Sequence, residues 1–535
     1  MLRLHLFILI VFFAITQLPA GPHLREQGDA TQLIVDGQPL LMLAGELGNS
    51  SASSIEYMQP IWPKLEAMNL NTLLAPVYWE LLEPREGRFD FTHVDHLIHS
   101  AREHDLKLVL LWFGTWKNSM SCYAPLWVKQ DQERFPRART RDGEPQEIIT
   151  PFSSAALEAD ARAFAALMRH IKEIDEQDQT VVMVQVENEI GMIPEARDHS
   201  ELADQAFYKE VPNDLIEYLQ KHRDSLQPEL KQHWESQGYR TAGDWQTVFG
   251  SGVQTDELFM AWTFARYVDA VIEAGETAYS LPYYVNAALI RPGYQPGEYP
   301  SAGPLPHLLD VWRAAAPRID FLAPDIYFKS FAHWVTRYDV SGNPLFIPEV
   351  GNDQSVTNAF YAMAEHNAMG YSPFSIESLP DPGDNRLTRA YEVLEQLTPL
   401  ILKKQGTGEL AGVLLDSVRQ SRSIELGDYR FHIRHEYTWP YAARMPGDEI
   451  PRYGGMIIEL APDEFFIAGS GIVITFDSQT EGVRAGIGEM EEGEFKDGQW
   501  VRGRRMNGDQ SHQGRHMHLS GQIYSIQRVK LYEYK

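Results

Sequence analysis

The sequence predicts an α/β protein in which a (β/α)8 barrel is followed by a smaller all-β, sandwich-like domain. Eight apolar runs alternate with helical patterns as far as residue 404, and eight strand-then-helix units are typical of a closed parallel barrel. From residue 405 the pattern changes to period-two segments separated by glycine-rich turns, which favours a β-sandwich. A doubly wound sheet would also alternate strands with helices, but no glycine-rich phosphate loop follows the first strand.

The expected barrel strands are continuous apolar runs, as suits strands that are covered on both faces. They span 39–48, 71–80, 107–114, 181–189, 282–289, 321–328, 344–351 and 371–378. Helices are expected between and after them at 54–69, 93–105, 154–177, 256–279, 304–316, 355–369 and 387–404. In the helix at 154–177, Leu157, Ala161, Phe164 and Met168 recur at four- and three-residue spacings, which marks one buried face.

Residues 1–20 predict a secretory signal peptide. Arg3 supplies the positive start, an apolar run extends from Leu6 to Ile15, and Pro19 and Ala20 form a small-residue end. The apolar run is short for a stable membrane span, so we expect cleavage and a periplasmic or secreted protein with no membrane partner. The remaining chain then divides into a barrel at 21–404 and a β-domain at 405–535. Residues 192–255 are too long for a simple connection and are expected to form an insertion, either over the barrel mouth or as a solvated helical excursion.

The composition and net charge limit the classes of molecule that the protein is expected to bind. A net charge of −27 would repel nucleic acid, so a neutral substrate is favoured, and the twelve tryptophans offer stacking faces for sugar rings. Cys122 is the only cysteine, so no disulfide within the chain is possible. The 18 histidines are scattered, and we expect neither a metal nor a cofactor. The sequence does not fix the oligomeric state.

Two carboxylates stand out because each ends a predicted barrel strand. Glu189 follows the fourth strand and Glu349 the seventh, so both would lie on the rim where barrel enzymes place their chemistry. Cleavage of a glycosidic bond needs two such groups: one protonates the leaving oxygen, and the other attacks the anomeric carbon or activates water. The prediction depends on the pair, since a single carboxylate at the end of a strand is usually structural.

The end of the fourth strand raises a question of direction. Period-two alternation would send Glu187 and Glu189 to the same face, with Glu187 as a structural carboxylate, and Asn188 to the other side. Asn188 can turn toward a substrate only if the strand is locally irregular.

Three motifs resemble those of known enzymes. They are "ENE" at 187–189, "PEVG" at 348–351 and "YWELLEPREGRFDF" at 78–91. Together they resemble the clan A glycoside hydrolases, and more closely the bacterial family 35 and family 42 β-galactosidases. The resemblance spans roughly residues 30–400. The segment after residue 405 resembles, more loosely, the β-domain appended to a bacterial subgroup of these enzymes.

The resemblance implies roles for four residues. Glu189 would be the acid/base residue and Glu349 the nucleophile of a retaining, double-displacement reaction. Asn188 would bond the 2-hydroxyl of the sugar, a contact that can strengthen as oxocarbenium character develops. Tyr327, after the sixth strand, would orient the nucleophile.

The stretch after the third strand departs from the family pattern. Gly114 and Trp116 are present, but Lys117 and Asn118 stand where an acidic sugar contact would be expected. Either Lys117 or Asn118 would then recognise the galactose hydroxyls, or the glycone differs. Trp116 is a further candidate substrate contact. Two further candidates, Glu46 and Asn49, follow the first strand.

The resulting prediction is an exported retaining exo-β-galactosidase that removes terminal β-galactosyl residues from plant-type oligo- or polysaccharides. Two alternatives stay open. One is another clan A β-glycosidase with a different glycone, and the other is a non-catalytic carbohydrate-binding barrel.

Overall fold

The computed structural model describes residues 21–351, 356–439 and 449–535, so the predicted signal peptide lies outside the described residues. Eight parallel strands close into a barrel in chain order, which confirms the predicted fold class. They are β4 (Met42–Glu46), β5 (Thr72–Tyr78), β6 (Lys107–Lys117), β9 (Val181–Asn188), β10 (Tyr283–Ala288), β11 (Phe321–Ile326), β12 (Ile347–Val350) and β13 (Gly370–Pro373). All eight fall on the apolar runs expected from the sequence.

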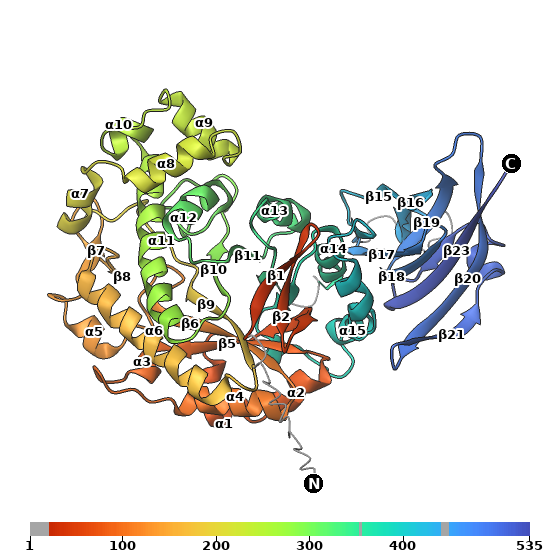
Figure 1. Cartoon of the computed structure of the whole chain (residues 1–535), viewed down its shortest axis with the longest axis horizontal. Coiled ribbons are helices and arrows are strands. Elements are labelled where there is room, and N and C mark those ends of the chain that lie inside the picture. The colour runs from red at the N-terminus through yellow and green to blue at the C-terminus, as the bar shows by residue number, and fades with distance from the viewer. Residues whose placement is uncertain (1–20, 352–355, 440–448) are drawn as a thin grey trace, which may run out of the picture.

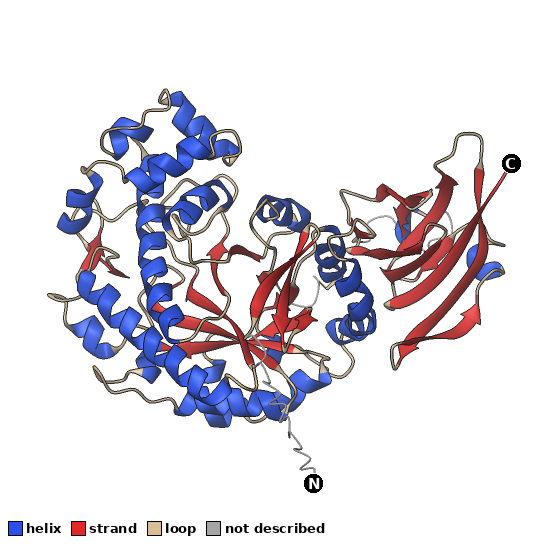
Figure 2. Ribbon diagram, viewed as in Figure 1, coloured by secondary structure: helices blue, strands red, loops and turns tan. Residues whose placement is uncertain are grey.

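Helices surround the barrel, as Figure 2 shows. They are α1 (Ile55–Met58), α2 (Trp62–Ala67), α4 (Thr92–Glu103), α6 (Ser154–Asp175), α11 (Val253–Ala278), α12 (Leu309–Ala315), α13 (Phe331–Tyr338), α14 (Thr357–Glu365) and α15 (Arg386–Lys404). The sequence prediction omitted α13. Its buried residues Phe331, Trp334, Val335 and Tyr338 follow the helical spacing, but the segment is only eight residues long.

A small antiparallel sheet precedes the barrel and consists of β1 (His23–Gln27), β2 (Ala30–Val35) and β3 (Gln38–Leu40). Asp36, after β2, donates its backbone N–H to Gln179, which precedes β9. Its carboxylate lies 3.3 Å from the ammonium of Lys107, the first residue of β6. These contacts place the sheet at the N-terminal ends of the barrel strands, so the opposite end is left for the site.

Two insertions enlarge the barrel. The first, between β6 and α6, contains α5 (Leu126–Gln130) and the pair β7 (Arg137–Arg139) and β8 (Pro145–Ile149). The second, between β9 and α11, contains α7 (Glu201–Phe207), α8 (Asn213–Lys221), α9 (Pro228–Ser236) and α10 (Trp245–Phe249). Figure 1 shows α8, α9 and α10 standing at one end of the molecule. Asp310 of α12 anchors this insertion, because it accepts hydrogen bonds from the Tyr218 hydroxyl and the Gln227 backbone.

The C-terminal part is a sandwich of two antiparallel sheets. The larger sheet has the order β14 (Leu410–Leu415), β17 (Tyr453–Ala461), β18 (Glu464–Ser470), β23 (Ser525–Tyr534), β20 (Arg484–Lys496) and β21 (Gln499–Arg505). The smaller has the order β15 (Ser421–Leu426), β16 (Tyr429–His435), β19 (Ile472–Ser478) and β22 (Met517–Leu519). Alternating inward residues, such as Phe431 and Ile433 of β16, form the core between the sheets.

The sandwich packs against two barrel helices, α14 and α15. The rings of Phe360 and Tyr524 stack with centroids 5.4 Å apart, and Gln396 accepts a hydrogen bond from the backbone of Phe495 at 2.8 Å. Glu365 lies within 2.5 Å of the guanidinium of Arg422. The larger sheet is therefore buried on both faces where it meets the barrel.

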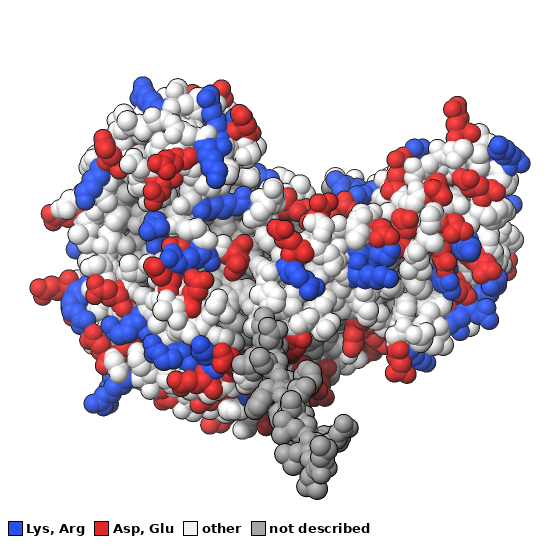
Figure 3. Space-filling view, in the orientation of Figure 1, with Lys and Arg blue, Asp and Glu red and all other residues white. Residues whose placement is uncertain are grey.

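Charge is spread over both parts of the molecule. Acidic and basic side chains are interspersed on the face shown in Figure 3, although the net charge of the chain is −27. Among the described residues, no helix combines the length and the apolar character needed to cross a bilayer.

Candidate active site

The C-terminal ends of five barrel strands bring together four carboxyl groups and one ammonium group. They are Glu46 of β4, Lys117 of β6, Glu189 after β9, Asp325 of β11 and Glu349 of β12, and each is at most 6% exposed. Asp325 and Glu349 pair directly across neighbouring strands. Five ionisable side chains buried in one place cost a great deal of solvation free energy, which is common where they perform chemistry.

Residues at the end of β6 donate hydrogen bonds to three successive side chains at the end of β9, those of Glu187, Asn188 and Glu189. The backbone N–H groups of Thr115 and Trp116 donate to the Glu187 carboxylate at 3.0 and 2.7 Å. Lys117 donates to the side-chain oxygen of Asn188 at 2.7 Å, and the amide of Asn118 donates to the Glu189 carboxylate. Asn118, which the sequence predicted as a substrate contact, thus bonds a carboxylate of the protein in this structure.

The backbone of this segment is irregular. Trp112 pairs with Val186 and Lys117 with Asn188, so four residues of β6 stand opposite a single residue of β9. Glu187 and Glu189 both have positive φ, at 61° and 44°, a region that residues other than glycine rarely adopt. The irregularity required to turn Asn188 toward a substrate is therefore present.

Glu187 does not share the face of Glu189, so the expectation from period-two alternation was wrong. Its carboxylate is fully buried toward the helix layer, close to Asp160 of α6. Burial and the Asp160 carboxylate raise the pKa of Glu187 well above its ordinary value. Asp160 in turn accepts hydrogen bonds from the Trp112 indole and the Thr115 hydroxyl. Positive φ at Glu187 and Glu189 redirects successive side chains, which explains why alternation fails here.

Glu349 has one oxygen held and one oxygen free. The hydroxyl of Tyr327, on the loop after β11, donates to Oε1, while Oε2 is buried without a hydrogen-bond partner. Burial, followed by the charge of Glu189, raises the pKa of Glu349 to about 7, and Lys117 and the Tyr327 bond oppose that rise. Burial and then the Glu349 charge raise the pKa of Tyr327, so its hydroxyl stays a donor.

Asn286 and Asp325 connect the two carboxylates that the sequence singled out. The backbone N–H of Glu189 donates to Asn286 Oδ1 at 2.9 Å, and Asn286 Nδ2 donates to Asp325 Oδ2 at 2.6 Å. Asp325 is the strand partner of Glu349. Burial, then the charge of Glu349, raises the pKa of Asp325 well above its ordinary value. Asn286 and Asp325 were not among the predicted site residues, although their place at the ends of apolar runs was a signal for them.

The other predicted contacts divide into two groups. Glu46 lies at the site with Oε1 unpartnered, and burial followed by Glu349 raises its pKa well above the ordinary value. Asn49 is half-buried on the loop after β4, also with an unpartnered side-chain oxygen. Trp116 is not brought to the group: it is fully buried against Phe264 and Tyr267 of α11, and its indole donates to a backbone carbonyl.

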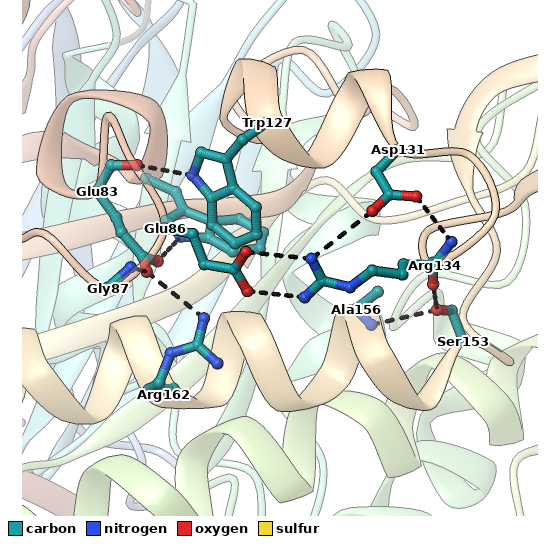
Figure 4. Close-up of polar contacts among 10 residues, drawn as sticks. Glu83, Glu86, Gly87, Trp127, Asp131, Arg134, Ser153, Ala156 and Arg162 are labelled. Carbon is teal, nitrogen blue, oxygen red and sulfur yellow. Dashed lines mark hydrogen bonds and ion pairs between the residues drawn. The ribbon is translucent and has the colours of Figure 1, made fainter.

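The tryptophan–glutamate–glycine motif after β5 has a structural role away from these carboxyls. Glu83 is fully buried, and its carboxylate accepts hydrogen bonds from the Trp79 indole at 2.9 Å and the Gly87 backbone at 2.6 Å. Arg162 of α6 lies 3.5 Å from the same carboxylate, and the Trp127 indole donates to the Glu83 carbonyl (Figure 4). The motif thus fastens the loop after β5 to α6.

Comparison with known proteins identifies two segments of the chain. Residues 56–252 match the glycoside hydrolase family 42 model, which is described as Beta-galactosidase. Residues 387–518 match a family described as Domain of unknown function (DUF5597). The first match includes "ENE" and the motif after β5, and the second lies over α15 and most of the β-sandwich.

One curated relative is a Beta-galactosidase from Xanthomonas manihotis, which is 29% identical over 220 residues. The match covers 38% of this chain and 33% of the relative, so the chain spans about a third of the length of that protein. Similar solved structures include a beta-galactosidase from Rahnella sp. R3, with 16% identity and a TM-score of 0.47 over 68% of this chain and 58% of that one. Another is the beta-galactosidase from Bacillus circulans sp. alkalophilus, with 14% identity and a TM-score of 0.47 over 68% and 57%.

The family match covers the segment that carries Glu189 and the structural motif after β5. The resemblance to clan A glycoside hydrolases of the β-galactosidase kind is therefore confirmed for this segment, which lies in a closed parallel barrel that is followed by a β-domain.

Proposed function

We propose that the protein is a retaining exo-β-galactosidase. The observation that carries the proposal is the pair of buried carboxyl groups, Glu189 and Glu349, at the same rim of the barrel. Glycosidic cleavage by double displacement needs two such groups with different environments. Here one is bonded by Asn118, and the other has a buried oxygen with no partner.

Glu349 is the proposed nucleophile. Its Oε2 carries no hydrogen bond, so it is the oxygen that forms a bond to the anomeric carbon, while Tyr327 fixes the other oxygen. In the first step Glu189 gives a proton to the glycosidic oxygen as the bond from that oxygen to carbon 1 breaks. The aglycone leaves as an alcohol, and the glycone is held as an ester of Glu349.

Glu189 then acts as the base. It takes a proton from a water molecule whose oxygen attacks carbon 1, and the bond to Glu349 breaks to release the carboxylate and the sugar. Two inversions at carbon 1 retain the configuration.

Asn188, Glu46 and Asn49 are the proposed contacts to the sugar hydroxyls. Each has a buried side-chain atom without a partner: Asn188 Nδ2, Glu46 Oε1 and Asn49 Oδ1. Buried polar atoms are nearly always satisfied, so these three are suited to hydroxyl groups of a bound glycone. Tyr284 of β10 has a buried hydroxyl with the same property.

A different glycone is the second candidate, and one observation favours it. Lys117 and Asn118 stand at the expected sugar contact, but both are engaged with Asn188 and Glu189. Galactose recognition must then come from other residues, or another β-linked sugar is the glycone.

The test uses the wild type, Glu189→Ala and Glu349→Ala with a panel of nitrophenyl glycosides, with and without azide. Turnover of the β-galactoside, with the β-glycosyl azide formed by Glu189→Ala and the α-glycosyl azide by Glu349→Ala, is the expected result. Full activity in Glu349→Ala would rule out its role as nucleophile. Turnover of another glycoside alone would establish the second candidate. Binding of sugars without any turnover by the wild type would indicate a carbohydrate-binding barrel.

We also propose that the protein is exported and acts on galactosylated plant-type oligo- or polysaccharides. The support is the composition of residues 1–20 and the acidic, sugar-compatible site. Expression of the full chain, with cell fractionation and N-terminal sequencing, should give an extracytoplasmic protein that begins near residue 21. Release of free galactose from plant polysaccharide side chains, measured by chromatography, tests the substrate class.

A further inference from the structure

The feature that carries a further inference is the buried lysine at the end of β6. Lys117 is 5% exposed, and its ammonium donates to Asn188 Oδ1 at 2.7 Å. Asn188 is fully buried, and its Nδ2 has no hydrogen-bond partner. Both residues are thus enclosed, and a single contact determines how the amide is turned.

That contact can be made in one orientation only. An ammonium group has three donors and no acceptor, so it can face the oxygen of an amide and never its nitrogen. A neutral neighbour with both a donor and an acceptor would leave two orientations open. Lys117 therefore fixes the amide with its NH2 group pointing away from the ammonium.

Because Asn188 lies next to the proposed acid/base residue, the orientation of its amide decides which group can contact the glycone. Asn188 precedes the proposed acid/base residue, and Lys117 Nζ lies 4.0 Å from the Glu189 carboxylate. A glycone whose glycosidic oxygen faces Glu189 places the substituent of its carbon 2 next to the reacting carbon. The unpartnered NH2 group of Asn188 is then a donor for that substituent.

We propose that Lys117 is a positioning residue that holds the Asn188 amide as a donor and so makes a hydrogen-bond-accepting substituent at carbon 2 of the glycone a requirement for fast turnover. The proposal rests on the proposed glycosidase function. In this proposal Lys117 acts through the Asn188 amide and supplies no contact of its own to the glycone.

The experiment compares kcat/KM for a nitrophenyl β-galactoside and its 2-deoxy analogue, taking the ratio of the two as the measure of recognition at carbon 2. In the wild type we expect the ratio to exceed about 100, because loss of one enclosed hydrogen bond to a transition state has effects of that order. In Lys117→Met the ratio should fall at least about tenfold, chiefly through slower turnover of the parent substrate. Lys496→Met, which removes an exposed lysine from the C-terminal hairpin, should leave the ratio unchanged.

Three further variants keep the test decisive if Lys117→Met does not fold. Lys117→Gln can present either oxygen or nitrogen to Asn188, so its ratio should also fall. Lys117→Arg retains the donor and should keep a ratio within about threefold of the wild type. In Asn188→Asp the ratio should fall as far as in Lys117→Gln. The double variant with both changes should show no further fall, because both act on the same amide donor.

The outcomes separate the two proposals. An unchanged ratio in Lys117→Gln or Lys117→Met, with both substrates slowed equally, would overturn the positioning role and leave the glycosidase function intact. A wild-type protein that turns over no glycoside would overturn the proposed function, and the role of Lys117 with it.

Discussion

The side-chain oxygen of Asn286 accepts a hydrogen bond from the backbone N–H of Glu189, with the two atoms 2.9 Å apart. Glu189 has a φ of 44°, and a residue other than glycine held in this region costs about 1–3 kcal/mol. The other end of the Asn286 amide donates to Asp325, the strand partner of Glu349. One amide therefore holds the proposed acid/base residue in a disfavoured conformation and connects it to the strand of the proposed nucleophile.

Replacement of Asn286 by alanine should lower kcat by about 10- to 100-fold with a smaller change in KM, because Glu189 loses its anchor while the sugar contacts remain. Steady-state kinetics on the nitrophenyl galactoside measure this. The matched control is Asn507→Ala, which also removes an acceptor for a backbone N–H but lies in the C-terminal domain. Equal kinetic losses in both variants would contradict the anchoring role.

The pH dependence of kcat/KM should show an acid limb with an apparent pKa near 7. Glu349 must be ionised to attack, and burial followed by the charge of Glu189 raises its pKa to about 7. Glu189→Gln removes the repelling charge and should move the limb to lower pH, measured with a dinitrophenyl glycoside that needs no acid. Lys117→Met removes an attracting charge and should move it to higher pH. A limb near pH 4.5 in the wild type would be incompatible with this environment.

Glu349→Gln should abolish turnover and stabilise the protein at pH 8. The carboxyl has a pKa of about 7 in the fold and about 4.5 in the unfolded chain, so the folded state binds more protons between these values. Stability therefore falls as the pH rises from 4.5 to 7, by about 3 kcal/mol for this group. The free energy of unfolding of Glu349→Gln should therefore exceed that of the wild type by most of this amount at pH 8. At pH 4 the two proteins should be equally stable in this respect.

Chemical denaturation at both pH values measures the effect of Glu349→Gln. The control is Glu235→Gln, an exposed carboxyl on α9, which should change little at either pH. A destabilised Glu349→Gln at pH 8 would mean that the ionised carboxylate is well solvated or paired in the fold.

Glu83→Ala should lower the free energy of unfolding by about 2–4 kcal/mol, since it strands the Trp79 indole and the Gly87 N–H without an acceptor. Activity per folded molecule should stay within about twofold, because the residue has a structural role. Glu86→Ala, which breaks the exposed ion pair with Arg134 in the same loop (Figure 4), should cost less than about 1 kcal/mol. Thermal melts of both variants measure the contrast, and a specific loss of kcat in Glu83→Ala would give the motif a direct part in catalysis.

The sequence predicted the barrel because each strand is a continuous apolar run, and the topology of a parallel barrel then places Glu189 and Glu349 on one rim. It could not predict the direction of Glu187. That direction depends on the register shift between β6 and β9, which joins segments about 70 residues apart. The partners of Lys117 were hidden for the same reason: a lysine in a polar loop is normally solvated, and only the pairing of β6 with Asn188 buries it.

The packing of the larger C-terminal sheet has a consequence for the integrity of the chain. Met456, Ile458, Phe466 and Ile526 belong to the same continuous apolar cluster as the barrel, while residues on the opposite face of that sheet form the core of the sandwich. Removal of the sandwich would leave the apolar surface of α14 and α15 in water, and the isolated sandwich would expose the matching face. The two parts are thus thermodynamically coupled and not interchangeable modules, and heating should unfold them in one cooperative transition.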